Sequence, residues 1–255
     1  MLNLLKRVID MYNRFAYLYD ELINDVNYEE WIDYYFKIFQ RYGLKPKLGL
    51  DLGCGTGNLT TLFADKGIEM TGIDLSEDML MVAREKAEGR DILYLNQDMR
   101  QFELYGTVDF IVSSLDCLNY ITDKRDLLKV MKLVNNYLDP GGLFIFDINT
   151  DYKLENIIGN NTFILENENV FCSWQNEYDK KRKICDFYLT FFSEENGMYH
   201  RFDEEHSERA YSIDEIKSVI ESSGMRLLNV YDELSFKKPA SKSERVFFVA
   251  QEQGK

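Results

Sequence analysis

A glycine-rich segment near residue 50 has the residue types that let a chain wrap closely around a ligand. Gly53, Gly55 and Gly57 stand at alternate positions, directly after the apolar run Leu48–Leu52. Glycine adopts positive φ without steric cost and lets the backbone approach a bound molecule. An ordinary strand-to-helix turn often contains one glycine. Three at this spacing, with Asp51 two residues before the first, favour a binding loop.

The spacing also indicates which ligand this loop would take. A dinucleotide loop has the pattern G-x-G-x-x-G, in which a helix N-terminus faces a pyrophosphate. Asn58 stands where that pattern needs its last glycine, which disfavours a nicotinamide dehydrogenase. Asp51 would place a negative charge beside the loop, and a carboxylate suits an ammonium group better than a phosphate. S-adenosylmethionine carries such an ammonium on its methionine part.

An acid is expected at the end of the next strand. Asp74 ends the apolar run Ile68–Asp74, where a carboxylate can accept hydrogen bonds from both hydroxyls of a ribose. Asp74 could instead cap the following helix, but Ser76 can serve as that N-cap and leave Asp74 free. Leu75 or Met79 could supply an apolar surface for an adenine ring, although core packing explains Met79 almost as well.

The third strand, Ile92–Leu95, is followed by Gln97-Asp98-Met99. The Asp98 carboxylate could accept a hydrogen bond from an adenine amino group, and the Met99 backbone amide could donate to a ring nitrogen. Gln97 is expected to border the same site. All three segments lie at the carboxyl ends of neighbouring parallel strands, which is where open α/β sheets bind their ligands.

These loops require a particular arrangement of strands and helices. Short apolar runs alternate with helical patterns, which is typical of a parallel sheet covered by helices. The sequence predicts an α/β class, with a Rossmann-like seven-stranded, mostly parallel sheet whose last strand is antiparallel. The remaining strands are expected at Val108–Ser113, at Leu143–Ile148 after a turn at Asp139–Gly142, and around Leu227–Tyr231 and Val246–Ala250.

Residues of about 160–210 break this rhythm. Apolar and polar residues alternate there one position in two, as in Cys185, Phe187, Leu189 and Phe191. This period indicates strands with one wet face, which is typical of antiparallel pairing. We therefore expect an antiparallel β insertion after the fifth strand, packed over the open end of the sheet.

The composition limits the partners and the compartment. The formal net charge is −14, and an acidic surface repels phosphate backbones, so nucleic-acid substrates are disfavoured. Four dispersed cysteines and two histidines predict no metal site. The N-terminus lacks the unbroken apolar run of a signal peptide or membrane span. We expect a soluble cytoplasmic protein, a monomer or homodimer, with reduced thiols and no membrane partner.

Together these segments resemble the class I S-adenosylmethionine-dependent methyltransferases. The match covers about residues 48–149, with D-x-G-x-G-x-G, G-I-D-L-S, Q-D-M and P-G-G-L-F-I-F-D in order, a series highly specific for that superfamily. The resemblance implies S-adenosylmethionine as cofactor and S-adenosylhomocysteine as product. It also implies that Asp74 binds the ribose and that Asp98 and Met99 bind the adenine. The residues implied around the methionine part are Asp51, Gly53, Gly55 and Gly57.

The flanks resemble a narrower group. Tyr12–Asp20, followed by Tyr28–Trp31, looks like the N-terminal lid of a bacterial branch of small-molecule methyltransferases, and Phe202–Tyr211 is similar to that branch. The branch also resembles glycine and sugar-amine N-methyltransferases, which place antiparallel strands over the acceptor pocket.

This second resemblance implies a domain organisation. Residues 1–255 would form a single methyltransferase domain, with a helical lid at residues 1–45 and the antiparallel insertion at residues 160–210 over the acceptor site. Three lid tyrosines could close over the bound cofactor, namely Tyr12, Tyr17 and Tyr19.

Methyl transfer demands little of individual side chains. It is an in-line displacement at a sulfonium carbon with a neutral leaving group, so the protein mainly aligns the reactants and excludes water. Ser113–Tyr120 should face the reactive methyl, with Leu115 beside the cofactor. This segment lacks the Asn/Asp-Pro-Pro-Tyr motif of enzymes that methylate amide or base nitrogens. The candidates to orient an acceptor are Asp116, Asn119 and Tyr120.

A general base is not required, but His206 is a candidate because imidazole titrates near neutral pH. It could equally be a strand histidine paired with Glu205 or Arg209. Cys117 is a weaker candidate for a nucleophile, since no histidine is near it in sequence. We predict methyl transfer to a small molecule, with an amine as one candidate acceptor. The alternative is a non-catalytic S-adenosylmethionine-binding module that acts through a protein partner.

Overall fold

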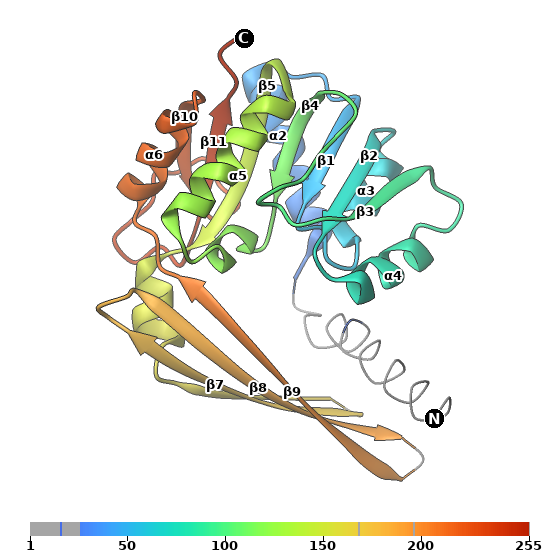
Figure 1. Ribbon diagram of the computed structural model, residues 1–255, viewed down its shortest axis with the longest axis vertical. Coiled ribbons are helices and arrows are strands. Elements are labelled where there is room, and N and C mark those ends of the chain that lie inside the picture. The colour runs from blue at the N-terminus through green and yellow to red at the C-terminus, as the bar shows by residue number, and fades with distance from the viewer. Residues whose placement is uncertain (1–15, 17–25, 168, 196, 255) are drawn as a thin grey trace.

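The computed structural model describes residue 16 and residues 26–254, except residues 168 and 196, and Figure 1 shows two β-sheets with helices packed on the larger one. None of the helices in these residues is long and apolar enough to cross a membrane. The α-helices are α2 (Tyr28–Tyr42), α3 (Asn58–Asp65), α4 (Glu77–Lys86), α5 (Lys124–Tyr137) and α6 (Ile213–Ser222). A 3-10 turn η1 (Cys117–Tyr120) and a π-helical turn η2 (Lys153–Ile158) accompany them.

The larger sheet has seven strands in the spatial order β10-β11-β5-β4-β1-β2-β3. Strands β1 to β5 pair in parallel, whereas β11 pairs antiparallel with both β5 and β10. The predicted fold class is therefore confirmed, including the antiparallel last strand. The bounds are β1 (Leu48–Leu52), β2 (Glu69–Asp74), β3 (Ile92–Asn96), β4 (Val108–Ser113), β5 (Leu138–Asn149), β10 (Arg226–Asp232) and β11 (Arg245–Gln251).

Helices cover both faces of this sheet because its central strands are apolar at nearly every position. On one face α2 and α3 pack Phe39 and Phe63 against Phe110 of β4, with ring centroids 4.7 Å and 5.3 Å from the Phe110 ring. On the other face Val130 of α5 and Ile216 of α6 belong to the main apolar cluster. The strand ends that carry the predicted site therefore project from a rigid scaffold.

One predicted turn lies inside a strand. We expected Asp139–Gly142 to separate a helix from a strand, but β5 begins at Leu138, directly after α5. Val108 pairs with Leu138 and Phe110 with Leu143, so the residues between form a bulge within the pairing. Gly141 has a φ of 80°, which only glycine adopts without strain, and this allows the strand to resume its register.

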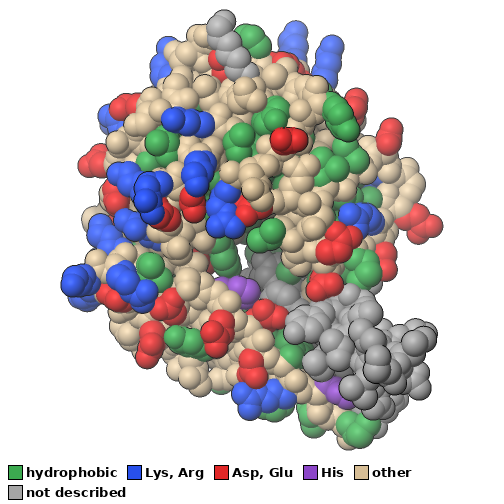
Figure 2. All heavy atoms as spheres, in the orientation of Figure 1, with side chains coloured by type: hydrophobic (Ala, Val, Ile, Leu, Met, Phe, Trp, Pro, Cys, Tyr) green, Lys and Arg blue, Asp and Glu red, His purple; other side chains and the backbone are tan. Residues whose placement is uncertain are grey.

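The smaller sheet is antiparallel and lies beyond the carboxyl ends of β4 and β5 (Figure 1). Cys185 and Phe187 face an apolar cluster of their own with Leu154 of η2, which explains the period of two in the sequence. Figure 2 shows a hollow between the two sheets. The strands are β6 (Thr162–Glu166), β7 (Val170–Asp179), β8 (Ile184–Glu195) and β9 (Met198–Arg209).

Candidate active site

The glycine loop follows β1 and folds back against β2. The amides of Gly53 and Cys54 donate to the Ile73 carbonyl at 2.8 Å and 2.9 Å. Gly53, Gly55 and Gly57 all have positive φ, at 82°, 53° and 76°. The loop therefore has the backbone conformation that the glycine spacing predicted.

The three loop glycines differ in what surrounds them. A Cβ on Gly53 would lie 2.8 Å from Cys117 Sγ, and a Cβ on Gly57 would lie 2.5 Å from Tyr94 Oη. Among the described residues, a Cβ on Gly55 would meet no atom within 4 Å. Gly53 and Gly57 are thus needed for packing within the protein, whereas Gly55 borders open space in which a ligand can lie.

Asp74 ties the end of β2 to this loop. Its Oδ2 accepts a hydrogen bond from the Gly55 amide and its Oδ1 accepts one from the Ser76 amide, both at 2.8 Å. Ser76 caps α4 as predicted, because its hydroxyl accepts from the Met79 amide at 3.3 Å. Burial raises the pKa of Asp74. An ionised carboxylate accepts about four hydrogen bonds, so positions remain for ribose hydroxyls.

Asp51 is a buried acid on β1, just before the loop. Its Oδ2 accepts a hydrogen bond from the Thr60 hydroxyl at 2.6 Å. Burial raises its pKa to about 7, and the negative charge of Asp74 adds to the increase. Among the described residues no lysine or arginine forms an ion pair with it. A cationic group placed here would relieve the cost of burying the charge.

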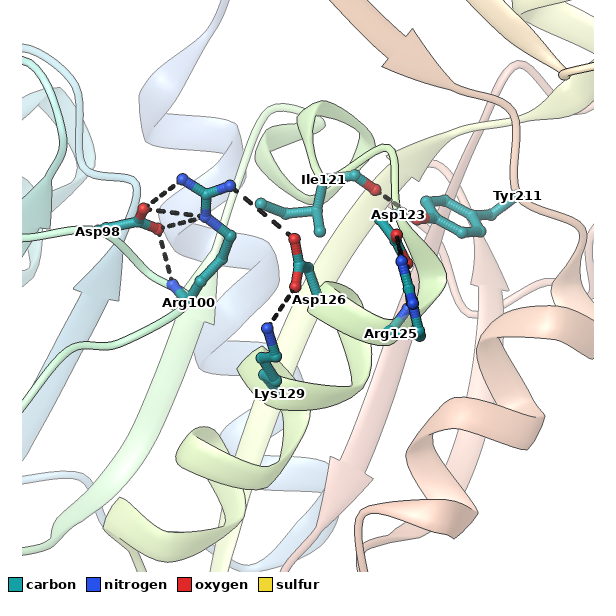
Figure 3. Close-up of polar contacts among 8 residues, drawn as sticks. All are labelled: Asp98, Arg100, Ile121, Asp123, Arg125, Asp126, Lys129 and Tyr211. Atoms are coloured by element: carbon teal, nitrogen blue, oxygen red, sulfur yellow. Dashed lines mark hydrogen bonds and ion pairs between the residues drawn. The ribbon is translucent and has the colours of Figure 1, made fainter.

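Asp98, after β3, is held by Arg100. Arg100 Nε lies 2.9 Å from both Asp98 oxygens, its amide donates to Oδ1 at 2.9 Å, and its Nη2 forms an ion pair with Oδ2. Arg100 Nη1 also lies 3.9 Å from Asp126 Oδ2 of α5 (Figure 3). These contacts lower the pKa of Asp98, which stays ionised. The predicted adenine acceptor thus already has a charged partner.

The other predicted cofactor residues lie around the same strand ends. Leu75 is 67% exposed, as an apolar surface open to a ligand would be. The Met99 side chain lies beside Gly53, since a Cβ there would be 3.4 Å from Met99 Cε. Gln97 instead holds Glu103, whose amide donates to Gln97 Oε1 at 2.7 Å.

Leu115 and Asp116, after β4, both have left-handed backbones, with φ of 58° and 57°. Such a conformation costs a non-glycine residue about 1–2 kcal/mol. The Asp147 carboxylate of β5 offsets this cost, because it accepts hydrogen bonds from the Leu115 amide at 2.8 Å and the Asp116 amide at 3.0 Å. The turn predicted to face the reactive methyl is therefore held by an acid in the next strand.

Arg245 of β11 completes this arrangement. Its Nη1 forms an ion pair with Asp147, and its Nη2 lies 2.6 Å from Asp116 Oδ1. The guanidinium also lies 5.6 Å from the ring centroid of Trp31 in α2. Burial raises the pKa of Asp147 to about 6, and the charge of Arg245 limits that increase. Asp116 is thus oriented by an ion pair through Oδ1, and whether it also orients an acceptor stays a prediction.

Asn119 has a different role from the one the sequence suggested. It is fully buried, and its Nδ2 donates to the carbonyls of Asn149 and Arg209, both at 3.0 Å. Its Oδ1 accepts from the Asn149 amide at 3.0 Å. Because both amide hydrogens are used, Asn119 joins β5 to β9 and is placed to position the site rather than to contact an acceptor.

Tyr120 and His206 lie together, one from η1 and one from β9. Their ring centroids are 5.9 Å apart in an edge-to-face arrangement, and Tyr120 is 45% exposed. Burial lowers the pKa of His206, so the imidazole is neutral at pH 7. Of the two partners considered for His206, Arg209 instead forms an ion pair with Glu215. Whether His206 acts as a base stays a prediction.

Cys117 is not a nucleophile candidate in this structure. Its Sγ lies 3.0 Å from the Ser114 carbonyl and 3.3 Å from the Gly53 carbonyl, so the thiol donates to the backbone. Burial raises its pKa well above the ordinary value. A nucleophilic cysteine requires the opposite shift, because the thiolate is the reactive species.

Three charged residues near this turn were missed by the sequence reasoning. Asp147 interrupts an apolar strand run, Phe144 to Ile148, and an acid in a buried strand is a signal that could have found it. Arg245 stands at the first position of β11, where the sequence marks it no differently from a surface residue. Glu208 lies among several other acids of β9, so nothing in the pattern singled it out.

Three of the predicted site residues lie outside the described part of the chain. Tyr12, Tyr17 and Tyr19 belong to the part of the chain that is not described. Within the part that is described, no group of three or more histidine, cysteine, aspartate or glutamate side chains could hold a metal ion. A cavity of about 410 Å³ near Tyr211 and Ser243 contains none of the predicted site residues and is not this site.

The chain is similar to known proteins over nearly its whole length. Residues 50–142 match the methyltransferase domain family. The Bacillus subtilis protein named "Putative methyltransferase YqeM" is 34% identical over 243 residues, which cover 94% of this chain and 97% of that protein. The crystal structure of an S-adenosylmethionine-dependent methyltransferase from Clostridium acetobutylicum has a TM-score of 0.88 and 37% identity, covering 96% of this chain and all of that one.

More distant structures share the fold. The S-adenosylmethionine-bound structure of CalS10, an amino pentose methyltransferase from Micromonospora echinaspora, has a TM-score of 0.65 and 18% identity, covering 82% of this chain and 84% of that one. Nearly full-length similarity, the ordered motifs and the geometry of the strand ends agree. The chain belongs to the class I S-adenosylmethionine-dependent methyltransferases.

Proposed function

We propose that this methyltransferase acts on a small molecule that accepts the methyl group at an amine nitrogen. The observation that carries the proposal is that acids at the ends of β1, β2 and β4, namely Asp51, Asp74 and Asp116, all lie close enough to the Cys117 thiol to raise its pKa. Asp74 also accepts a hydrogen bond from the Gly55 amide, beside the open space at Gly55. Asp51 would bind the ammonium of the methionine part and Asp74 the ribose. Asp98, Met99 and Leu75 would border the adenine.

An amine acceptor is favoured by charge. The chain carries a net charge of −14, and such a field attracts cationic small molecules and repels nucleic acids. CalS10, which shares the fold, is named as an amino pentose methyltransferase. We propose that residues 160–210 cover the acceptor, as the resemblance implied.

The side chains would align and shield the reactants rather than form covalent intermediates. The methyl carbon passes from sulfur to nitrogen in one displacement, and S-adenosylhomocysteine leaves as a neutral thioether. The rigid turn at Leu115 and Asp116, held by Asp147, would fix the floor of the acceptor site. Such positioning can supply several kcal/mol of the barrier reduction.

Turnover of S-adenosylmethionine tests the proposal. The enzyme is mixed with small amines, amino sugars among them, each paired with the alcohol of the same carbon skeleton. We expect S-adenosylhomocysteine to form with amines and not with their alcohol counterparts. Turnover of alcohols alone would contradict the amine acceptor. Cofactor binding without turnover of any compound would favour a non-catalytic module.

Replacement of Asp74 should weaken the binding of the cofactor. Asp74→Ala is expected to reduce the affinity for S-adenosylmethionine by about 1.5–3 kcal/mol, because the ribose loses hydrogen bonds to a charged group. Calorimetric titration measures this, and thermal unfolding is followed in parallel because Asp74 also holds the Gly55 amide. Asp91→Ala, an exposed acid before β3, is the control. An unchanged dissociation constant would remove Asp74 from the site.

Gly55 offers a test with a closely matched control. Gly55 and Gly67 both have positive φ, and a Cβ at either would meet no atom of the described part of the chain within 4 Å. Alanine at either position should therefore lower the folding stability by a similar amount, about 1–2 kcal/mol. Only Gly55→Ala should lower the affinity for S-adenosylmethionine, by about tenfold or more, because its methyl group enters the ligand space. Equal affinities for the two variants would contradict this placement.

We propose a cytoplasmic location for the enzyme. Its four cysteines are free in the structure, three of them buried. Reduced, packed thiols are typical of proteins in a reducing compartment. The oligomeric state, monomer or homodimer, stays a prediction that sedimentation would test.

A further inference from the structure

A cavity of about 410 Å³ lies beside the main apolar cluster, on the side of the large sheet that α6 covers. Three segments that are distant in sequence form its wall: the chain that follows β5, the start of α6 and the loop between β10 and β11. Its floor is made by Ile148, Tyr211 and Val246, which belong to that cluster. Within the described chain, none of the predicted cofactor or acceptor residues lines it. The cavity is therefore separate from the proposed site of methyl transfer.

The wall of this cavity offers apolar surface to a ligand. Tyr152 and Pro239 are half-buried, Ile213 and Ala240 are exposed, and all four line the cavity. Small-molecule sites have volumes of roughly 300–1,000 Å³ and mostly apolar walls with a few well-placed polar groups. Because this cavity is near the lower end of that range, it fits a compact apolar body of about one aromatic ring.

Two acids give the cavity its charge. Asp151, two residues after β5, and Asp214, in the first turn of α6, both line the cavity and are exposed. Asp151 Oδ1 accepts a hydrogen bond from the Tyr152 amide at 2.9 Å. In the part of the chain that the structure describes, neither carboxylate forms an ion pair. Both acids therefore remain available to a cationic ligand.

The positive groups near the cavity do not cancel this charge. No lysine, arginine or histidine of the described chain lines it. Lys242 lines a different cavity, and Lys153 Nζ lies 3.0 Å from Asn149 Oδ1. The N-terminus of α6 carries only about half an elementary positive charge, and Glu215 of its first turn adds a further negative one. The cavity therefore attracts a cation and repels a carboxylate.

We propose that this cavity is a second ligand site, which binds an organic ammonium ion with an apolar body of about one aromatic ring. The ammonium lies near Asp151 and Asp214, and the apolar body lies against Tyr152 and Ile213. An ammonium has three N–H donors, and its hydrogen bonds to carboxylates are roughly twice as strong as neutral ones. The inference goes beyond the proposed function and does not depend on it, because no residue of the methyl-transfer site takes part.

Methyl NMR of the isoleucine side chains tests the inference on wild-type protein. Benzylammonium is the probe at pH 7, and benzyl alcohol and benzoate are its neutral and anionic counterparts. Ile148 and Ile213 line the cavity, so their δ1 methyl resonances report on its occupation. We expect benzylammonium to shift both resonances to saturation, with an affinity about tenfold or more above that of either counterpart. The absence of a saturable shift, or equal affinity for benzyl alcohol or benzoate, would overturn the inference.

The double variant Asp151→Asn, Asp214→Asn tests the two carboxylates. Asparagine preserves the size of each side chain and removes its charge. We expect the affinity for benzylammonium to fall by about tenfold or more, whereas the affinity for benzyl alcohol should change by less than about twofold. Glu221→Gln removes an exposed acid from the other end of α6, outside the cavity, and should change neither. An unchanged affinity for benzylammonium in the double variant would show that these acids do not bind it.

These measurements separate the two proposals. Benzylammonium that binds at the methyl-transfer site would still bind the double variant, whereas shifts of Ile148 and Ile213 that the double variant loses belong to the cavity. If amines are not methylated but the cavity binds benzylammonium, only the proposed function fails. If amines are methylated but these two resonances do not respond, only the second site fails. Should the double variant not fold, the comparison of the three probes on wild-type protein still decides.

Discussion

Replacing Arg245 with methionine should destabilise the protein by about 3–5 kcal/mol, which is the cost of leaving buried charges without their partner. Arg245 forms ion pairs with both Asp147 and Asp116, and Asp147 is fully buried. Methionine preserves most of the packing against Trp31 but supplies no charge. Urea denaturation followed by circular dichroism measures the change in the free energy of unfolding.

The pH dependence of this variant gives a second readout. The folded-state pKa of Asp147 is already raised to about 6, and loss of Arg245 would raise it further. A raised carboxyl pKa stabilises the folded state at low pH, and this contribution is lost as pH rises from the unfolded value near 4 through the folded one. Arg245→Met should therefore lose less stability at pH 5 than at pH 8.

Two variants control this experiment. Arg226→Met removes an exposed arginine of β10 whose Nη2 bonds to Gln251 at 2.9 Å, and it should change stability by less than about 0.5 kcal/mol. Adding Asp147→Asn to Arg245→Met should recover part of the loss, because one buried charge disappears. A loss below about 1 kcal/mol in Arg245→Met would mean that these ion pairs do not stabilise the fold.

Asp51→Asn should make the protein more stable and less able to bind its cofactor. The pKa of Asp51 is about 7 in the folded state and near 4 when unfolded. Wild-type stability should therefore decline as pH rises from 4 to 7, since the folded state retains a proton that the unfolded state has lost. Asparagine does not titrate, so the variant should be more stable at pH 8 by about 2–4 kcal/mol.

Cofactor binding should change in the opposite direction. If Asp51 binds the ammonium of S-adenosylmethionine, the variant should lose about 1.5–3 kcal/mol of affinity at pH 8. Wild-type affinity should also fall as the pH drops below 7, because Asp51 must release its proton, whereas the variant should show no such dependence. Calorimetric titration at pH 6 and pH 8 measures both effects. Equal affinities of the two proteins at pH 8 would show that Asp51 does not contact the ammonium.

Local sequence was sufficient for the parts of the site that lie within one strand and the turn after it. The conformation of the glycine loop follows from Gly53, Gly55 and Gly57, because positive φ is a local property. Asp74 could be placed at the end of β2 because the apolar run stops there. The alternation in residues 160–210 predicted an antiparallel sheet for a similar reason, since period two is visible in any single strand.

Contacts between side chains could not be obtained in this way, whether the residues are distant or close in sequence. Asn119 was assigned to the acceptor, yet it joins Asn149 to Arg209, which lies 90 residues away. Asp98 was assigned to adenine without its partner Arg100, although the two are close in sequence. The bulge at Gly141 was interpreted as a turn, because proline and glycine mark both features alike.

The sequence by itself determined the fold class, the cofactor and the strand ends that would hold it, because each depends on short segments with a fixed local pattern. Only the tertiary structure decided which charges are buried and what compensates them. Asp147, Arg245 and Glu208 come from β5, β11 and β9, and their burial depends on strands that pack together after the chain folds. A side chain's solvation, and hence its pKa, is a property of that packing rather than of its neighbours in sequence.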